Sequence, residues 1–240
     1  MEPAVNFQKM EAVILCGGRG TRLGDRTRDL PKPMMPVAGE PFLKILIDFL
    51  HPFSFRRVIL CTGYKDASIR QYFENYRGMP VVFSHESGPL GTGGALKQCE
   101  SLVESSPFLV MNGDSFCRID LPAFLDFHRQ RNSAVSVAGV DPGPRRDGGL
   151  LLTGKDGSIL AFGEKEASLD GVLNAGVYFF ERRMLDALPE NRFYSLEKDF
   201  FPGLCAKEKF YAWHSPEKLY DIGTPERLDE FRKLQASLSL

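Results

Sequence analysis

Short apolar runs alternate with helix-like segments along the first half of this chain, and this alternation restricts its fold more than any other feature. Strands are predicted at residues 12–15, 58–61, 80–83 and 108–111. Helices are predicted at residues 42–50, 66–73, 93–100 and 121–131. Strands that alternate with helices form β-α-β units, which build a mostly parallel sheet. The sequence therefore predicts an α/β protein.

The pattern changes after Ser133, where strands follow one another with few helices between them. Further strands are predicted at residues 134–140, 150–153, 159–162, 172–180 and 210–214, and helices at residues 182–188, 196–206 and 225–235. Because no linker is visible, we expect one domain over residues 1–240. Its first half, about residues 11–133, is α/β, and its second half, residues 134–240, is mixed and could hold a second substrate.

Composition and charge exclude several classes of protein. Of the 240 residues, 43% are hydrophobic and 25% are charged, which is typical of a globular protein. The net charge is -1 without basic clusters, so we expect no nucleic-acid partner. No apolar run is long enough for a membrane span or a secretory signal. The five cysteines contain no C-x-x-C pair, and we expect reduced thiols in a cytoplasmic protein.

A glycine-rich loop follows the first predicted strand, with the sequence Leu15-Cys-Gly-Gly-Arg-Gly-Thr-Arg-Leu23. Glycines allow backbone N–H groups to approach a phosphate, because no Cβ stands in the way. The spacing matches neither a P-loop nor a dinucleotide fingerprint, since Leu23 occupies the place of the third glycine. Arg19 and Arg22 add positive charge. The alternative is a plain turn between a strand and a helix.

A lysine lies between two prolines in the segment Pro31-Lys32-Pro33. Each proline fixes its own φ, and the second also restricts the lysine. This stiff backbone would present an ammonium group at a fixed place. The alternative is a rigid surface loop without a binding role.

Together, the glycine loop and the Pro-Lys-Pro-Met segment resemble the signature of sugar-1-phosphate nucleotidylyltransferases, and within that family the D-glycero-D-manno-heptose 1-phosphate guanylyltransferases most of all. Further matching motifs are Pro89-Leu-Gly-Thr-Gly-Gly-Ala95, Asn112-Gly-Asp114, Glu164-Lys165, Asn174-Ala-Gly-Val-Tyr178 and Asp221-Ile-Gly-Thr-Pro225. The resemblance implies a Rossmann-like, three-layer nucleotidyltransferase fold of the GT-A-like type, with a mostly parallel central sheet and a smaller mixed sugar-binding region. It also implies Mg²⁺ and a reaction in which a sugar 1-phosphate attacks a nucleoside triphosphate, giving a nucleotide-sugar and pyrophosphate.

The resemblance also implies roles for individual residues. The catalytic residues would be Arg22 on the β- and γ-phosphates, Lys32 near the α-phosphate, and Asp114, which would bind the metal together with Asp221. The nucleotide would be bound by Leu15, Gly17, Gly18, Gly20, Thr21, Arg22, Glu86, Gly91, Thr92 and Gly93. The sugar phosphate would be bound by Asn112, Gly148, Glu164, Lys165 and Asn174. If Glu164 and Lys165 lie on a strand, both can enter the site only where that strand ends or bulges.

The choice of base and sugar is open at this point. A carboxylate at Glu86 would accept both adjacent donors of guanine, which favours GTP over UTP. Relatives often have Arg-Tyr-Gly where this chain has Arg146-Asp147-Gly148, and this difference puts the heptose in doubt.

The alternatives are a uridylyl or other nucleotidyl transfer to a hexose or amino-sugar 1-phosphate, and a non-catalytic nucleotide-sugar sensor. A glycosyltransferase would typically carry an Asp-x-Asp motif, which is absent. The oligomeric state is not indicated.

Overall fold

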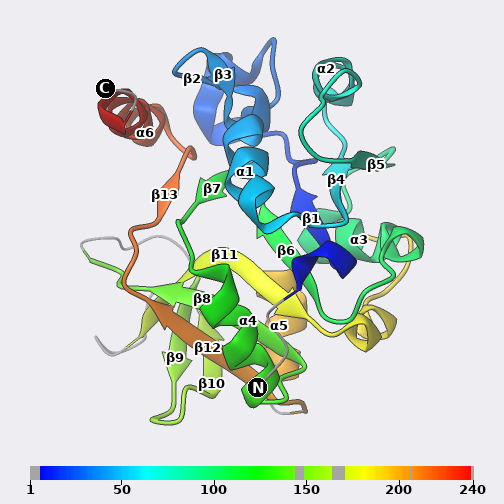
Figure 1. The fold of residues 1–240 in the computed structure, drawn as a ribbon, viewed down its shortest axis with the longest axis vertical. Helices are drawn as coiled ribbons and strands as arrows, with labels where there is room; N and C mark the ends of the chain where they lie inside the picture. The colour runs from blue at the N-terminus through cyan, green and yellow to red at the C-terminus, as the bar shows by residue number, and fades with distance from the viewer. Residues whose placement is uncertain (1–5, 144–148, 164–170, 206, 239–240) are drawn as a thin grey trace.

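The structure, a computed structural model, describes residues 6–143, 149–163, 171–205 and 207–238. Within these ranges nine strands form one sheet, in the order β10-β9-β11-β6-β1-β4-β5, with β8 beside β11 and β12 beside β8. Figure 1 shows this sheet running through the middle of the molecule, with helices packed against it. The predicted α/β architecture with a mostly parallel central sheet is confirmed.

The parallel part of the sheet is built from β1 (Glu11–Leu15), β4 (Arg57–Thr62), β5 (Val81–His85) and β6 (Phe108–Asn112). β1 lies at its centre, in parallel register with β4 and β6, so that Leu15 pairs with Cys61 on one side and Asn112 on the other. The carboxyl ends of these strands therefore meet at one edge. The glycine loop after Leu15 and the Asn112-Gly-Asp114 segment are brought together there.

The second half extends the same sheet with mixed strand directions. Its strands are β8 (Val135–Val140), β9 (Leu150–Thr153), β10 (Ile159–Gly163), β11 (Val172–Phe180) and β12 (Phe210–Ser215). β11 joins the two halves, because it runs antiparallel to β6 on one side and to β8 and β9 on the other. β12 lies parallel to β8. The change of strand pattern after Ser133 therefore coincides with a change of strand direction within one sheet.

Helices cover both faces of the sheet. One apolar cluster packs α1 (Phe42–Leu50), α2 (Asp66–Phe73), α4 (Leu121–Gln130) and α6 (Pro225–Leu238) against one face. A second cluster packs α3 (Gly91–Gln98) and α5 (Phe201–Leu204) against the other face. The alternation of side chains along β1 explains this division, since Ala12 and Ile14 belong to the first cluster and Val13 to the second. The result is a three-layer arrangement.

Two predicted helices take a different form. Residues 182–188 form the 3-10 helix η6 (Arg182–Ala187), and residues 196–206 form a π-helical turn, η7 (Leu196–Phe200), followed by the short α5. Pro202 has no N–H group and cannot donate a hydrogen bond within a continuous helix, which explains why no single long helix forms there. The π turn is closed by the bond from Phe200 N to Ser195 O, at 3.1 Å.

Several short elements were not predicted. They are η1 (Phe7–Lys9), η2 (Thr21–Thr27), η3 (Lys32–Met34), η4 (His51–Phe53), η5 (Glu100–Leu102), and the two-residue strands β2 (Pro36–Val37), β3 (Glu40–Pro41), β7 (Ser115–Phe116) and β13 (Tyr220–Asp221). Elements this short carry no periodic signal in the sequence. No helix within the described ranges is both long and apolar enough to cross a membrane.

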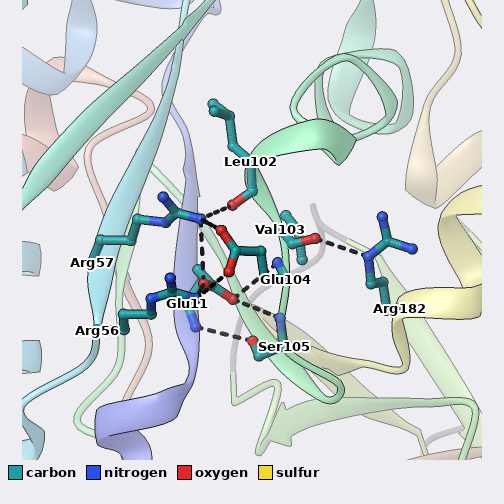
Figure 2. Close-up of polar contacts among 8 residues, drawn as sticks. All are labelled: Glu11, Arg56, Arg57, Leu102, Val103, Glu104, Ser105 and Arg182. Carbon is teal, nitrogen blue, oxygen red and sulfur yellow. Dashed lines mark hydrogen bonds and ion pairs between the residues drawn. The ribbon is translucent and has the colours of Figure 1, made fainter.

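A buried carboxylate fixes the end of the sheet opposite the glycine loop (Figure 2). Glu11 is fully buried, and its Oε2 accepts a 2.8 Å hydrogen bond from Ser105 N. Its Oε1 lies 3.3 Å from Arg56 Nη1 and 3.5 Å from Arg57 Nη2. Both arginines also pair with Glu104. The cluster ties the segment before β6 to the amino ends of β1 and β4, a structural role far along β1 from the glycine loop.

Candidate functional site

A cavity of about 770 Å³ opens at the carboxyl ends of the parallel strands, where ligands bind in open α/β sheets. The glycine loop, the segment after β5 and the start of α3 line it. A second cavity of about 280 Å³ lies beside it, against β11, β13 and the start of α6. The residues that line both cavities are Arg22, Lys32, Asn112, Asp114 and Glu197. Two substrates in the two cavities would therefore meet at these five side chains.

The glycine loop packs directly onto the lysine of the Pro-Lys-Pro segment. Gly20 has a φ of +64°, and a Cβ built on it would lie 2.8 Å from the Lys32 Cβ. Any other residue would be both strained and too close at this position. Leu15, Gly17, Gly18, Gly20 and Arg22 all line the larger cavity. The backbone of Thr21 begins η2, and its side chain lies outside the described part of the structure.

Lys32 is buried and aimed at the junction of the two cavities. It begins η3 after an extended Pro31, so the prolines hold its backbone in one conformation. The residue is only 6% exposed, and its Nζ lies 2.7 Å from Asp114 Oδ2. The side chain of Asp114 is 43% exposed, so this carboxylate is paired with the ammonium and open to solvent at the same time. The structure thus places a fixed ammonium group beside a carboxylate that a ligand can reach.

The second predicted metal ligand comes to the same place through a short strand pair. β13 pairs with β7, so that Asp221 lies opposite Ser115, the residue after Asp114. The N–H of Ile222 also donates to Asp114 O at 3.0 Å. Asp221 accepts a bond from Gly223 N at 2.8 Å and lies 3.2 Å from Arg227 Nη1. Both carboxylates therefore line the smaller cavity, although residues 114 and 221 are far apart in the sequence.

Glu86 lines the larger cavity, and its carboxylate lies between two glycines. A Cβ on either Gly17 or Gly63 would overlap its carboxylate, so both positions must be glycine for the side chain to lie there. Its Oε2 accepts a 3.1 Å bond from Leu90 N. Burial raises the pKa of this carboxyl above its usual value, although the Leu90 bond and nearby His85 oppose the shift. A half-buried carboxylate at this place can accept donors from a flat base.

The start of α3 differs from the expected binding role at one residue. Gly91 and Thr92 line the larger cavity, but Gly93 does not. The N–H groups of Gly93 and Gly94 instead donate to Tyr194 O, at 2.8 and 3.1 Å. The first donors of this helix are thus occupied by the chain itself, and a nucleotide contact through the Gly93 N–H is not available in this arrangement.

Two side-chain amides, Asn112 and Asn174, line the smaller cavity. The Nδ2 of Asn174 donates to the Tyr178 hydroxyl at 2.8 Å. Its Oδ1 accepts from Gly176 N at 2.9 Å. Asn112 lines both cavities, and its Oδ1 is buried with no partner among the described residues. A buried amide oxygen without a donor is costly, so a ligand hydroxyl or water at this oxygen would complete the site.

Three residues predicted to bind the sugar phosphate, Gly148, Glu164 and Lys165, lie outside the described residues, as does Asp147. Two site residues were missed by sequence reasoning. Glu197 lines both cavities, and Phe193 lines the larger one while remaining 66% exposed. Neither stands in a recognisable spacing, and both follow a stretch without periodicity. Glu197 reaches the site through the contacts between η7 and α3, and Phe193 lies in the segment just before η7.

Comparison with known proteins agrees with this geometry. The family model described as nucleotidyl transferase matches residues 11–237. The chain is 34% identical to a D-glycero-alpha-D-manno-heptose 1-phosphate guanylyltransferase of Aneurinibacillus thermoaerophilus, over 95% of this chain and 98% of the relative. It is 37% identical to a mannose-1-phosphate guanylyltransferase of Mycobacterium tuberculosis, over 91% of this chain, and spans 62% of that relative's length.

A solved structure shows the same fold. HddC from Yersinia pseudotuberculosis, crystallised as a complex with GMP-PN, superposes with a TM-score of 0.82 at 32% identity. The match covers 94% of this chain and 99% of HddC. The family model matches nearly the whole chain, and the heptose relative and HddC match it over almost their full lengths. The chain belongs to the nucleotidyl transferase family.

Proposed function

We propose that this chain transfers GMP from GTP to a sugar 1-phosphate, releasing pyrophosphate. The observation that carries the proposal is the Lys32–Asp114 pair at the junction of two cavities. The glycine loop that lines the larger cavity supports binding of a nucleoside triphosphate there, and the amides and carboxylates that line the smaller cavity support binding of the sugar hydroxyls. A reaction that joins two substrates needs this kind of meeting point.

The chemistry required of the protein is mainly positioning and charge neutralisation, because both substrates are polyanions. An oxygen of the sugar phosphate attacks the α-phosphorus of GTP, and the bond from that phosphorus to the pyrophosphate oxygen breaks. Lys32 would stabilise the charge that develops on the α-phosphate. Arg22, which lines both cavities, would hold the leaving pyrophosphate through the planar fork of its guanidinium.

Asp114 and Asp221 would hold a Mg²⁺ ion. Mg²⁺ prefers hard oxygen ligands and usually takes one or two carboxylates while keeping several waters. Two neighbouring carboxylates, one of them 43% exposed, fit this preference. No group of three or more potential ligands occurs within the described ranges, which suits Mg²⁺ better than a fully protein-bound metal. When bound, the ion would offset phosphate charge during transfer.

Guanine is the proposed base because a half-buried carboxylate, Glu86, lines the larger cavity. The ionised carboxylate accepts two hydrogen bonds, and guanine presents two adjacent donors on its Watson–Crick edge. The relatives are guanylyltransferases, and HddC was crystallised with the guanine nucleotide analogue GMP-PN. Both observations support guanine as the base.

The acceptor is proposed to be a heptose 1-phosphate, with mannose 1-phosphate as the second candidate. The heptose relative matches this chain over 98% of its own length, which supports the heptose. The higher identity of 37% to the mannose enzyme supports the alternative.

We further propose a cytoplasmic reaction, since all five cysteines carry free thiols.

The test is pyrophosphate release from a matrix of GTP, UTP, CTP, dTTP and ATP against heptose, mannose, glucose and N-acetylated hexosamine 1-phosphates, with Mg²⁺. We expect release with GTP and a heptose or mannose phosphate, and a GDP-sugar by mass spectrometry. Release with UTP alone would agree with nucleotidyl transfer to a sugar 1-phosphate but would contradict guanine as the base. Folded protein that releases no pyrophosphate with any pair would overturn the proposed function.

A further inference from the structure

Glu197 occupies the junction of the two cavities without a role in the proposed chemistry. It is one of the five residues that line both cavities, together with Arg22, Lys32, Asn112 and Asp114. It comes from the π turn η7, and π turns occur frequently at functional sites. An acidic side chain that has been assigned neither to the base nor to the metal is unexpected where two polyanions must approach each other.

The carboxylate is held in a defined orientation. Its Oε2 accepts hydrogen bonds from the hydroxyls of Thr92 at 2.7 Å and Ser195 at 2.9 Å. The Thr92 hydroxyl also accepts a 2.8 Å bond from Leu196 N. A hydroxyl has a single proton, so Thr92 must donate it to Glu197. Two donors therefore point at Oε2, and the orientation of the whole carboxylate is fixed.

The other oxygen, Oε1, takes no hydrogen bond from any described residue. An ionised carboxylate is only an acceptor, with about four lone-pair sites, so it can take further donors. Phosphate oxygens carry no protons to donate at neutral pH and would be repelled. The ligand groups that match Oε1 are hydroxyls. At the junction, the hydroxyl nearest the reacting phosphate is the one on the sugar carbon next to the phosphate-bearing carbon, the 2-hydroxyl.

We infer that Glu197 accepts a hydrogen bond from the 2-hydroxyl of the acceptor sugar and thereby orients the sugar phosphate for attack. This inference rests on the proposed function, because it assumes a sugar 1-phosphate in the smaller cavity. It also gives Thr92 a different role from nucleotide binding, since its hydroxyl positions Glu197. Glu197 is thus a residue that determines specificity for the acceptor.

The test compares the preferred acceptor, mannose or heptose 1-phosphate, with its 2-deoxy analogue in wild type and in Glu197→Gln. In the variant the amide oxygen would face the Thr92 and Ser195 hydroxyls, so the amide NH₂ would face the cavity. A donor would then replace the acceptor. Glu190→Gln is the matched control, because Glu190 is exposed and lines neither cavity.

In wild type, removal of the 2-hydroxyl should lower kcat/KM by about tenfold to a hundredfold, the usual effect of a hydrogen bond to a charged group. In Glu197→Gln, kcat/KM for the normal acceptor should fall by a similar factor, and the preference over the 2-deoxy sugar should shrink toward one. The KM for GTP should change less than about threefold. Glu190→Gln should behave as wild type does.

A wild-type enzyme that uses both sugars equally well would overturn the inference, even if the variant did not fold. An undiminished preference in Glu197→Gln would also overturn it. A variant with a changed Mg²⁺ dependence and an unchanged sugar preference would instead make Glu197 a metal ligand, against the inference. A folded wild-type protein that transfers to neither sugar would overturn the proposed function itself, which is a separate result.

Discussion

Glu86 combines burial with charge at the point where the base is proposed to bind. Burial raises its pKa, so this carboxyl takes up a proton at a higher pH than an ordinary glutamate. A protonated carboxyl offers a donor where guanine also offers donors, and one acceptor is lost. Binding of guanine should therefore be strong above the pKa of Glu86 and weaken as the pH falls through it.

This predicts a pH dependence that Glu86→Gln removes. The Kd for GTP, measured by equilibrium titration between pH 4 and pH 8, should rise toward acid in wild type more steeply than in the variant. Protonation of the triphosphate affects both proteins equally, so the difference between the two curves reports the carboxyl. Parallel curves would mean that Glu86 does not contact the base.

Asp114 is predicted to be a metal ligand that also anchors Lys32. In Asp114→Asn the side chain keeps its size and loses its charge, so its affinity for Mg²⁺ should fall. A Mg²⁺ titration of the rate should need a higher concentration for half-maximal activity, and the maximal rate should fall as well. A titration identical to that of wild type would show that Asp114 does not bind the metal.

At the residue scale, most of the predicted site residues that the structure describes line one of the two cavities, and their roles stay predictions. The glycine loop at residues 15–23 and Lys32 belong to two nearby motifs, and the family resemblance that these motifs carry predicts a phosphate site. Glu197 could not be found this way, because its place depends on hydrogen bonds to a residue about a hundred positions earlier. The reassignment of Gly93 likewise follows from the position of Tyr194, which no local pattern predicts.

At the scale of elements, the docking of α3 against the segment before η7 closes one side of the larger cavity. Gly91 has a φ of +71°, and a Cβ built there would lie 2.7 Å from Tyr194 O. Its conformation and its contact therefore both require glycine. The same contact surface holds Thr92 against Glu197.

Gly91→Ala should therefore lower the free energy of unfolding by about 1–3 kcal/mol, the cost of a strained backbone position. It should also raise the KM for GTP, because the cavity wall moves. Gly203→Ala is the control, since no atom lies within 4 Å of a Cβ there and its φ is not positive. Denaturant unfolding checks both variants. Equal stability of Gly91→Ala and wild type would show that the contact between Gly91 and Tyr194 O has room for a Cβ.

Elements with a clear period were predictable, and those defined by contacts were not. The apolar run before the glycine loop and the amphipathic pattern of α4 gave strand and helix at nearly the observed bounds. The π turn at Leu196–Phe200 was predicted as part of a longer helix, because its hydrophobic pattern does not reveal the interruption that Pro202 introduces. β13 has two residues and exists only through its pairing with β7.

At the scale of the whole molecule, one sheet brings two binding regions to the same edge. The parallel half places the glycine loop at its carboxyl edge, and β11 carries the mixed half against the same edge through its pairing with β6. The alternation of strands and helices predicts the first region. The antiparallel attachment of the second could not be predicted, since it depends on long-range strand pairing.

The central claim is that transfer takes place at the Lys32–Asp114 pair, where the two cavities meet. The most direct measurement is the single-turnover rate of GMP transfer from GTP in wild type and in Lys32→Met, together with thermal unfolding of both. Methionine keeps the buried apolar stem, and the exposed side of Asp114 lets water replace the lost ammonium, so stability should change little. We predict a rate lower by about a hundredfold to a thousandfold, the usual loss for one preorganised charge-stabilising group. A folded Lys32→Met protein that transfers GMP at nearly the wild-type rate would contradict the claim.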